Sequence, residues 1–226
     1  MKRRVLTFVL GAIGMPSLLC AADLTPPKDR QIQVAVVMTE GATMIDFAGP
    51  WEVFHDVMIE GVPDSLSMPF SLFTVGASRK PIRISGGMTM VPDYTFATAP
   101  NADIVLVGAQ RGAPELTAYL RRMRRQSRIV MSVCTGAFKL ADAGLFDGKQ
   151  ATTHHEFTEG LATRFPKVKV VPPEHRFVQA DSVVFSAGGL TSGIDLALHV
   201  VELYFGREVA ERTARYMEYQ GAGWRD

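Results

Sequence analysis

Short apolar runs alternate along the chain with longer segments in which apolar residues recur every three or four positions. The short runs predict buried strands and the longer segments predict helices packed against them. The predicted strands cover residues 33–38, 70–75, 104–107, 128–133 and 168–171. The predicted helices cover residues 44–58, 114–125, 135–143, 154–165, 194–204 and 207–219. This alternation predicts an α/β fold, one domain with a mainly parallel sheet flanked by helices.

Two further segments are predicted to fold back on themselves. Residues 82–91 are interrupted by Gly86-Gly87, which predicts a hairpin or a bent edge strand. Residues 176–185 predict a hairpin that turns around Ala180-Asp181.

The charge of the chain favours a small-molecule partner. Its 226 residues, with 24 Lys and Arg against 23 Asp and Glu, suit one domain of nearly balanced charge. Five arginines lie within residues 121–128, but a single short cluster on a helix is predicted to be a solvated face. We expect no binding to nucleic acid and none to a membrane once the leader is removed.

Residues 1–22 predict a secretory signal. A positive start, Lys2-Arg3-Arg4, precedes an apolar stretch and the small residues Ala21-Ala22. The predicted division of the chain is a signal at 1–22, a linker at 23–32 and one domain at 33–226, with a periplasmic or secreted product. A retained anchor, lipidation at Cys20 and a twin-arginine route stay open as alternatives. Cleavage would leave Cys134 as the only thiol, and a thiol that stands alone in an oxidising compartment is either reactive or a small buried hydrophobe.

The sequence around Cys134 favours a reactive thiol. Cys134 stands where a predicted strand becomes a predicted helix, with the small residues Ser132 and Gly136 two positions before and after it. A nucleophile elbow needs that spacing because larger side chains collide as the chain reverses. The adjacent helix N-terminus predicts a lowered thiol pKa.

Four ordered blocks of the chain resemble the ThiJ/PfpI superfamily, which is class I glutamine amidotransferase-like and flavodoxin-like in fold. The blocks are MIDFAGPWEVF at 44–54, VCTGAF at 133–138, AGLFDG at 143–148 with ATTH at 151–154, and TSGIDLA at 191–197. The resemblance runs from about residue 34 to residue 219 and is strongest to the isonitrile hydratase branch. It implies a cysteine-dependent lyase that needs no cofactor or metal and forms a homodimer.

The resemblance also implies roles for individual residues. Cys134 is the expected nucleophile, Asp46 the proton shuttle, and Thr135 a source of an N–H and a hydroxyl. Burial among apolar neighbours is expected to raise the pKa of Asp46. Residues expected to bind substrate or a developing oxyanion are Gly108, Ala109, Thr135 and His154.

The chain departs from the pattern of the superfamily at two positions. Ala109 stands where a second glycine is usual in the oxyanion-binding turn. His155 stands where a tryptophan is usual, which predicts a more polar pocket wall. The region that carries His-x-Glu in amidotransferases is Gly188-Gly189-Leu190-Thr191 here, so we expect no triad.

Three functions stay open from the sequence. The first is hydration of isonitriles to N-substituted formamides, and the second is glyoxalase or deglycase action on reactive carbonyls. The third is a non-enzymatic redox or ligand sensor. Only about twenty residues follow Gly206, too few for a helix-turn-helix domain, so we do not expect a transcription regulator within this chain.

Overall fold

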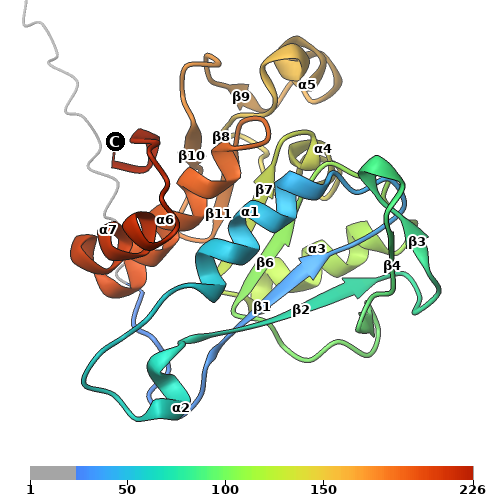
Figure 1. The fold of residues 1–226 in the computed structure, drawn as a ribbon. Coiled ribbons are helices and arrows are strands. Elements are labelled where there is room, and N and C mark those ends of the chain that lie inside the picture. Colours follow the sequence, from blue (N-terminus) through green and yellow to red (C-terminus); the bar gives the residue numbers. More distant parts are fainter. Residues whose placement is uncertain (1–23, 226) are drawn as a thin grey trace, which may run out of the picture.

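The structure is a computed structural model that describes residues 24–225. The leader predicted at 1–22, Cys20 included, lies outside these residues. Seven strands form the main sheet in the order β10-β11-β7-β6-β1-β2-β5 (Figure 1). They are β1 Ile32–Val37, β2 Phe70–Gly76, β5 Tyr94–Thr95, β6 Ile104–Val107, β7 Ile129–Val133, β10 Phe177–Gln179 and β11 Val184–Ala187. Neighbouring strands run parallel except β10 and β11, so the predicted α/β fold with a mainly parallel sheet is confirmed.

Helices cover both faces of this sheet, as strands that are apolar on both sides require. The helices are α1 Met44–His55, α2 Asp64–Ser67, α3 Leu116–Gln126, α4 Gly136–Asp142, α5 Thr158–Arg164, α6 Ser192–Phe205 and α7 Arg207–Tyr216. One core joins α1, α6 and α7 to the sheet through residues such as Phe54, Met131 and Leu196. A second core joins α3 and α4 to the opposite face through residues such as Leu120, Val130 and Leu140. Cys134 therefore follows a strand that is buried between two helical layers (Figure 1).

Both predicted hairpins are present, and the predicted helices and strands differ from the observed ones mainly at their ends. Strands β3 Ile82–Arg83 and β4 Thr89–Met90 pair antiparallel around the turn at Ser85–Gly87, and β10 pairs antiparallel with β11. Helix α1 ends at His55 and does not reach residue 58. The strand expected at 168–171 is the short β9 Lys169–Val170, paired with β8 Gln150–Ala151. The sequence did not predict β5, α2 or β8, because segments of two to four residues show no periodicity.

Residues 24–31, which cover most of the predicted linker, pack against the domain. Leu24 is buried in the first core, and Arg30 donates two hydrogen bonds to the Asp103 carboxylate at 2.6 and 2.9 Å. The main-chain N–H of Gln33 donates to the same carboxylate at 2.9 Å. Within residues 24–225 no helix has the length and apolar character needed to cross a membrane.

Candidate active site

Cys134 occupies a strained turn between β7 and α4. Its φ is 58°, a left-handed conformation that costs roughly 1–3 kcal/mol for a residue with a side chain. The two shortest hydrogen bonds of its main chain run from its N–H to the Gly188 carbonyl at 2.7 Å and from the Thr153 hydroxyl to its carbonyl at 2.9 Å. Longer ones of 3.3 Å join its N–H to the Ala187 carbonyl and the Ala137 N–H to its carbonyl. The predicted change from strand to helix at this cysteine is present, and the surrounding contacts hold the strained turn in place.

The first residue of α4 explains why the elbow needs a small side chain after the cysteine. A Cβ on Gly136 would collide with the main-chain carbonyls of Val107 and Gly108. Those carbonyls belong to the end of β6, the strand beside β7. The close approach brings the loop after β6 against the elbow and places residues 108 and 109 near Cys134.

Asp46 lies in the first turn of α1 and is fully buried. Its Oδ2 accepts a hydrogen bond from the Ala109 N–H at 2.8 Å. A Cβ on Gly108 would lie 2.8 Å from the Cβ of Asp46, so a side chain at 108 would displace the carboxyl group. Burial raises the pKa of Asp46 to about 6, although the Ala109 N–H, the Cys134 thiol and the Leu190 N–H favour its ionised form. The predicted raised pKa is confirmed.

The predicted lowering of the Cys134 pKa is wrong. The thiol is only 6% exposed, and its burial together with the negative charge of Asp46 raises its pKa to about 11. The N–H groups of Thr135 and Leu190 stabilise the thiolate, but their effect is smaller than that of burial. The sequence indicated the helix end and gave no measure of the desolvation that outweighs it.

Asp46 and Cys134 therefore form a pair that holds one proton over a wide pH range. Because the carboxyl group ionises near pH 6 and the thiol near pH 11, the pair at neutral pH is a carboxylate beside a thiol. Oδ1 of Asp46 is buried and has no hydrogen bond of good geometry within the described residues. The Cys134 thiol contacts the Asp46 carboxyl group, as an acid/base partner for a nucleophile requires.

The other predicted site residues lie around this pair in different ways. Thr135 is the half-buried N-cap of α4, and its N–H acts on the thiol as expected. The Ala109 N–H is already bonded to Asp46, so in this structure it positions the carboxylate. The roles of Gly108, Ala109 and His154 toward a substrate stay predictions.

Leu190 is a site residue that the sequence analysis missed. Its φ is 55°, so it is a second residue with a side chain held in the left-handed conformation, and its N–H acts on both the thiol and Asp46. The only sequence signal was the preceding Gly188-Gly189, which predicted a turn. A left-handed leucine leaves no mark of its own in a sequence.

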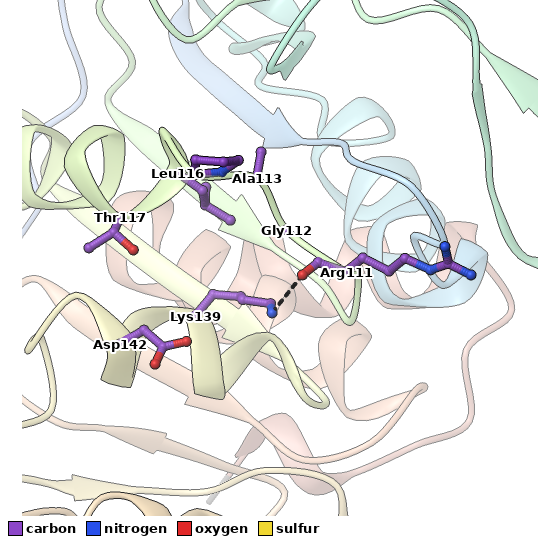
Figure 2. Close-up of a pocket in the computed structure, with 8 residues that line it drawn as sticks. Arg111, Gly112, Ala113, Leu116, Thr117, Lys139 and Asp142 are labelled. Carbon is purple, nitrogen blue, oxygen red and sulfur yellow. Dashed lines mark hydrogen bonds between the residues drawn. The ribbon is translucent and has the colours of Figure 1, made fainter.

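Two cavities lie near the carboxyl ends of the strands. One, of about 240 Å³, is lined by Thr153, His154, His155, Pro173, Arg176 and residues 188–192. Thr153 and Gly188 hydrogen-bond to the main chain of Cys134, and the Leu190 N–H acts on its thiol. Three residues of this cavity wall therefore lie next to Cys134. The other, of about 350 Å³, lies between the loop before α3 and α4, where the Lys139 ammonium donates to the Arg111 carbonyl at 2.9 Å (Figure 2). Neither Cys134 nor Asp46 is among the residues that line either cavity, and only the first cavity shares wall residues that contact Cys134.

The described part of the chain contains no cluster of three or more His, Cys, Asp or Glu side chains arranged to hold a metal ion. His154 and His155 stack on each other with ring centroids 4.4 Å apart. The His154 Nδ1 accepts a hydrogen bond from the Glu156 N–H at 3.3 Å. These contacts place the His154 ring beside the cavity as part of its wall.

Residues 32–203 match the DJ-1/PfpI family. The chain belongs to this family. An isonitrile hydratase of Pseudomonas putida is 29% identical over 84% of this chain and 80% of that protein. The transcriptional regulator GbdR of Pseudomonas aeruginosa is 28% identical over 86% of this chain, which spans about half (53%) of the regulator. The predicted resemblance to the ThiJ/PfpI superfamily is thus confirmed.

Solved structures of DJ-1/PfpI relatives share the fold. A ThiJ/PfpI family protein from Pseudomonas syringae superposes with a TM-score of 0.71 at 25% identity, covering 95% of this chain and 85% of that one. The DJ-1beta protein of Drosophila melanogaster superposes with a TM-score of 0.69 at 16% identity, covering 84% of this chain and 100% of that one. Enzymes and regulators therefore both occur among the relatives, and the family alone does not assign an activity.

Proposed function

We propose that this protein is a cysteine-dependent enzyme that hydrates isonitriles to N-substituted formamides. The observation that carries the proposal is the buried pair of Cys134 and Asp46, in which a carboxylate with a pKa of about 6 lies beside a thiol with a pKa of about 11. A buried thiol with a high pKa is a poor nucleophile unless a base takes its proton as it reacts. Asp46 is placed to be that base. The similarity to isonitrile hydratase supports the choice of substrate.

In the first step the thiol adds across the terminal carbon of R–N≡C. Asp46 takes the thiol proton while the sulfur bonds to that carbon, and the carboxyl group then gives the proton to the same carbon. The product is a thioimidate, R–N=CH–S–Cys134. The Thr135 and Leu190 N–H groups hold the sulfur while it carries negative charge.

In the second step water displaces the sulfur. Asp46, again ionised, takes a proton from the water as its oxygen adds to the thioimidate carbon, and gives that proton to the nitrogen. The carboxylate then takes the proton of the new hydroxyl group as the C=O bond forms and the C–S bond breaks. Asp46 returns this proton to the sulfur, and R–NH–CHO leaves. The sum is addition of one water to the isonitrile, so no cofactor is consumed.

A parallel assay on two substrate classes tests the proposal. Formamide production from cyclohexyl isocyanide is measured beside consumption of methylglyoxal, for the wild type and for Cys134→Ala. We expect formamide from the wild type and none from the variant. Turnover of methylglyoxal alone would replace the hydratase by an enzyme that acts on carbonyls. No turnover of either substrate, with stoichiometric oxidation of Cys134 by peroxide, would leave the sensor.

A further inference from the structure

The cavity beside Cys134 has a polar wall that the proposed chemistry does not use. Arg176, His154, Thr191 and Ser192 all line it, and no carboxylate is among its lining residues. The side chain of Arg176 is 38% exposed, whereas that of its partner Asp195 is 1% exposed. Arg176 therefore lies between a buried carboxylate and an open cavity.

The guanidinium of Arg176 is held rigidly along one edge. Its Nε and Nη2 donate to Asp195 Oδ2 at 2.8 and 2.6 Å, and Nη2 donates to the Thr191 hydroxyl at 3.1 Å. The Tyr219 hydroxyl adjoins the same ion pair. The hydrogen bonds of good geometry to Asp195 and Thr191 use Nε and Nη2, and none of them uses Nη1. Nη1 is therefore the nitrogen left to donate to an anion, and because the guanidinium is already held in place, such binding costs little further side-chain entropy.

We propose that this cavity is a subsite for a carboxylate, in which Arg176 binds the acidic end of a substrate whose reactive carbon faces Cys134. The subsite rests on the geometry of the cavity, and its link to isonitriles rests on the proposed function. The preferred substrates are then small isonitriles that carry a carboxylate. A monoanion fits better than a phosphate dianion, because Asp195 already balances the charge of Arg176.

Because Asp195 and Arg176 carry opposite charges, replacing one or the other should change anion binding in opposite directions. Replacing Arg176 removes the donors to the carboxylate and weakens its binding. Replacing Asp195 by asparagine keeps a side chain that can accept hydrogen bonds but leaves the charge of Arg176 unbalanced, which strengthens binding of an anion. The two variants are expected to act in opposite directions. An arginine with a purely structural role would not produce this pattern.

The test compares alkylation of Cys134 by iodoacetate, which carries a carboxylate, with alkylation by neutral iodoacetamide. The rate ratio, normalised to that of a free thiol, is measured for the wild type, Arg176→Gln, Asp195→Asn and the double variant. We expect Arg176→Gln to lower the ratio roughly tenfold, as loss of hydrogen bonds between charged groups implies, and Asp195→Asn to raise it. The double variant removes both charges, so no unpaired carboxylate is left buried if Arg176→Gln folds poorly.

Arg128→Gln is the matched control, because Arg128 precedes β7 at the opposite end of the strand that carries Cys134. It removes the same charge and is expected to leave the ratio unchanged. Equal ratios in Arg176→Gln and Arg128→Gln would overturn the subsite.

Turnover separates the subsite from the reaction. Isocyanoacetate is compared with its methyl ester by kcat/KM in the wild type and in the double variant. Preference for the acid that is lost in the double variant supports both proposals. If iodoacetate is still preferred in alkylation but neither isocyanide compound is turned over, the proposed hydration is wrong and the carboxylate subsite stands. If isocyanoacetate and its methyl ester are turned over with equal kcat/KM, the carboxylate subsite is wrong and the proposed hydration stands.

Discussion

Two aspartates in this molecule are removed from water to similar degrees and have opposite properties. Asp46, at the carboxyl ends of the strands, is fully buried and its pKa is raised to about 6. Asp103 lies just before β6 at the other end of the sheet and is 9% exposed. Burial alone would raise its pKa too, but the hydrogen bonds from Arg30 and the Gln33 N–H hold the pKa below its usual range.

The difference lies in the partners. Asp103 has a cation and a main-chain donor on its two oxygens, whereas Asp46 has one main-chain donor of good geometry and a thiol. A buried carboxylate that is left without a cation is held ready to accept a proton. The comparison supports the proposal that Asp46 serves chemistry, in contrast to Asp103, whose carboxylate is held by Arg30 and the Gln33 N–H.

Enzymatic activity should separate the two aspartates most strongly. Asp46→Asn keeps the size of the side chain and removes the base, so we expect the rate of the proposed hydration to fall roughly 10²–10⁴-fold. Asp103→Asn is the matched control and is expected to leave the rate within a few-fold of wild type, provided that both proteins are folded by circular dichroism. Equal losses of rate in the two variants would contradict the assignment.

The two aspartates should also differ in how they make the free energy of unfolding depend on pH. The raised pKa of Asp46 means that its contribution to folding is present below the unfolded pKa near 4 and is lost as pH rises through about 6, at a cost of about 3 kcal/mol. Asp103 has the opposite sign, since a lowered pKa contributes stability above the unfolded pKa and loses it as pH falls. Urea unfolding of wild type, Asp46→Asn and Asp103→Asn between pH 2 and pH 8 measures both, because the Asp103 contribution is lost below the unfolded pKa near 4. For each variant, the difference from wild type in the free energy of unfolding is plotted against pH. Slopes of the same sign for the two variants would contradict the prediction.

The third prediction concerns the thiol. Because the charge of Asp46 raises the pKa of Cys134, Asp46→Asn is expected to lower the midpoint of iodoacetamide alkylation against pH from about 11. Asp103→Asn is expected to leave the midpoint in place. A midpoint that does not move in Asp46→Asn would mean that burial alone sets the thiol pKa.

The smallest expected effect concerns the support of the elbow. Thr153→Val removes the hydroxyl that donates to the Cys134 carbonyl and keeps the shape of the side chain. We expect a loss of about 1 kcal/mol in the free energy of unfolding, the net value of one hydrogen bond, since the carbonyl still accepts from the Ala137 N–H at 3.3 Å. Thr153→Ser should retain most of the stability. Equal stability of the valine and serine variants would show that the hydroxyl does not hold the turn.

Much of the fold could be predicted from the sequence because its signals are local. The apolar strands β1, β6 and β7 and the hairpin of β10 and β11 follow from runs of a few residues and from turn residues. The position of Cys134 followed from the small residues Ser132 and Gly136. These features depend on neighbours in the chain, and a sequence displays such neighbours directly.

The electrostatic state of the site could not be predicted, because it depends on residues that are distant in the chain. The burial that raises the Cys134 pKa is set by how α1 and the loop after β11 cover the thiol. The left-handed Leu190 and the pairing of Arg176 with Asp195 are likewise products of tertiary packing. The helix N-terminus beside Cys134 is only one local contribution to the thiol pKa, and the burial of the thiol outweighs it.

The left-handed turn at residue 134 also affects which substitutions would accumulate there if selection for the chemistry were lost. Glycine adopts that conformation at little cost, so Cys134→Gly would relieve the backbone strain, although it would also remove a side chain buried in the first core. A thiol retained at this position keeps that strain in the fold, as expected where activity and stability conflict. Among descendants of this chain, the identity of that one residue would distinguish lineages that still use the site from those that keep only the scaffold.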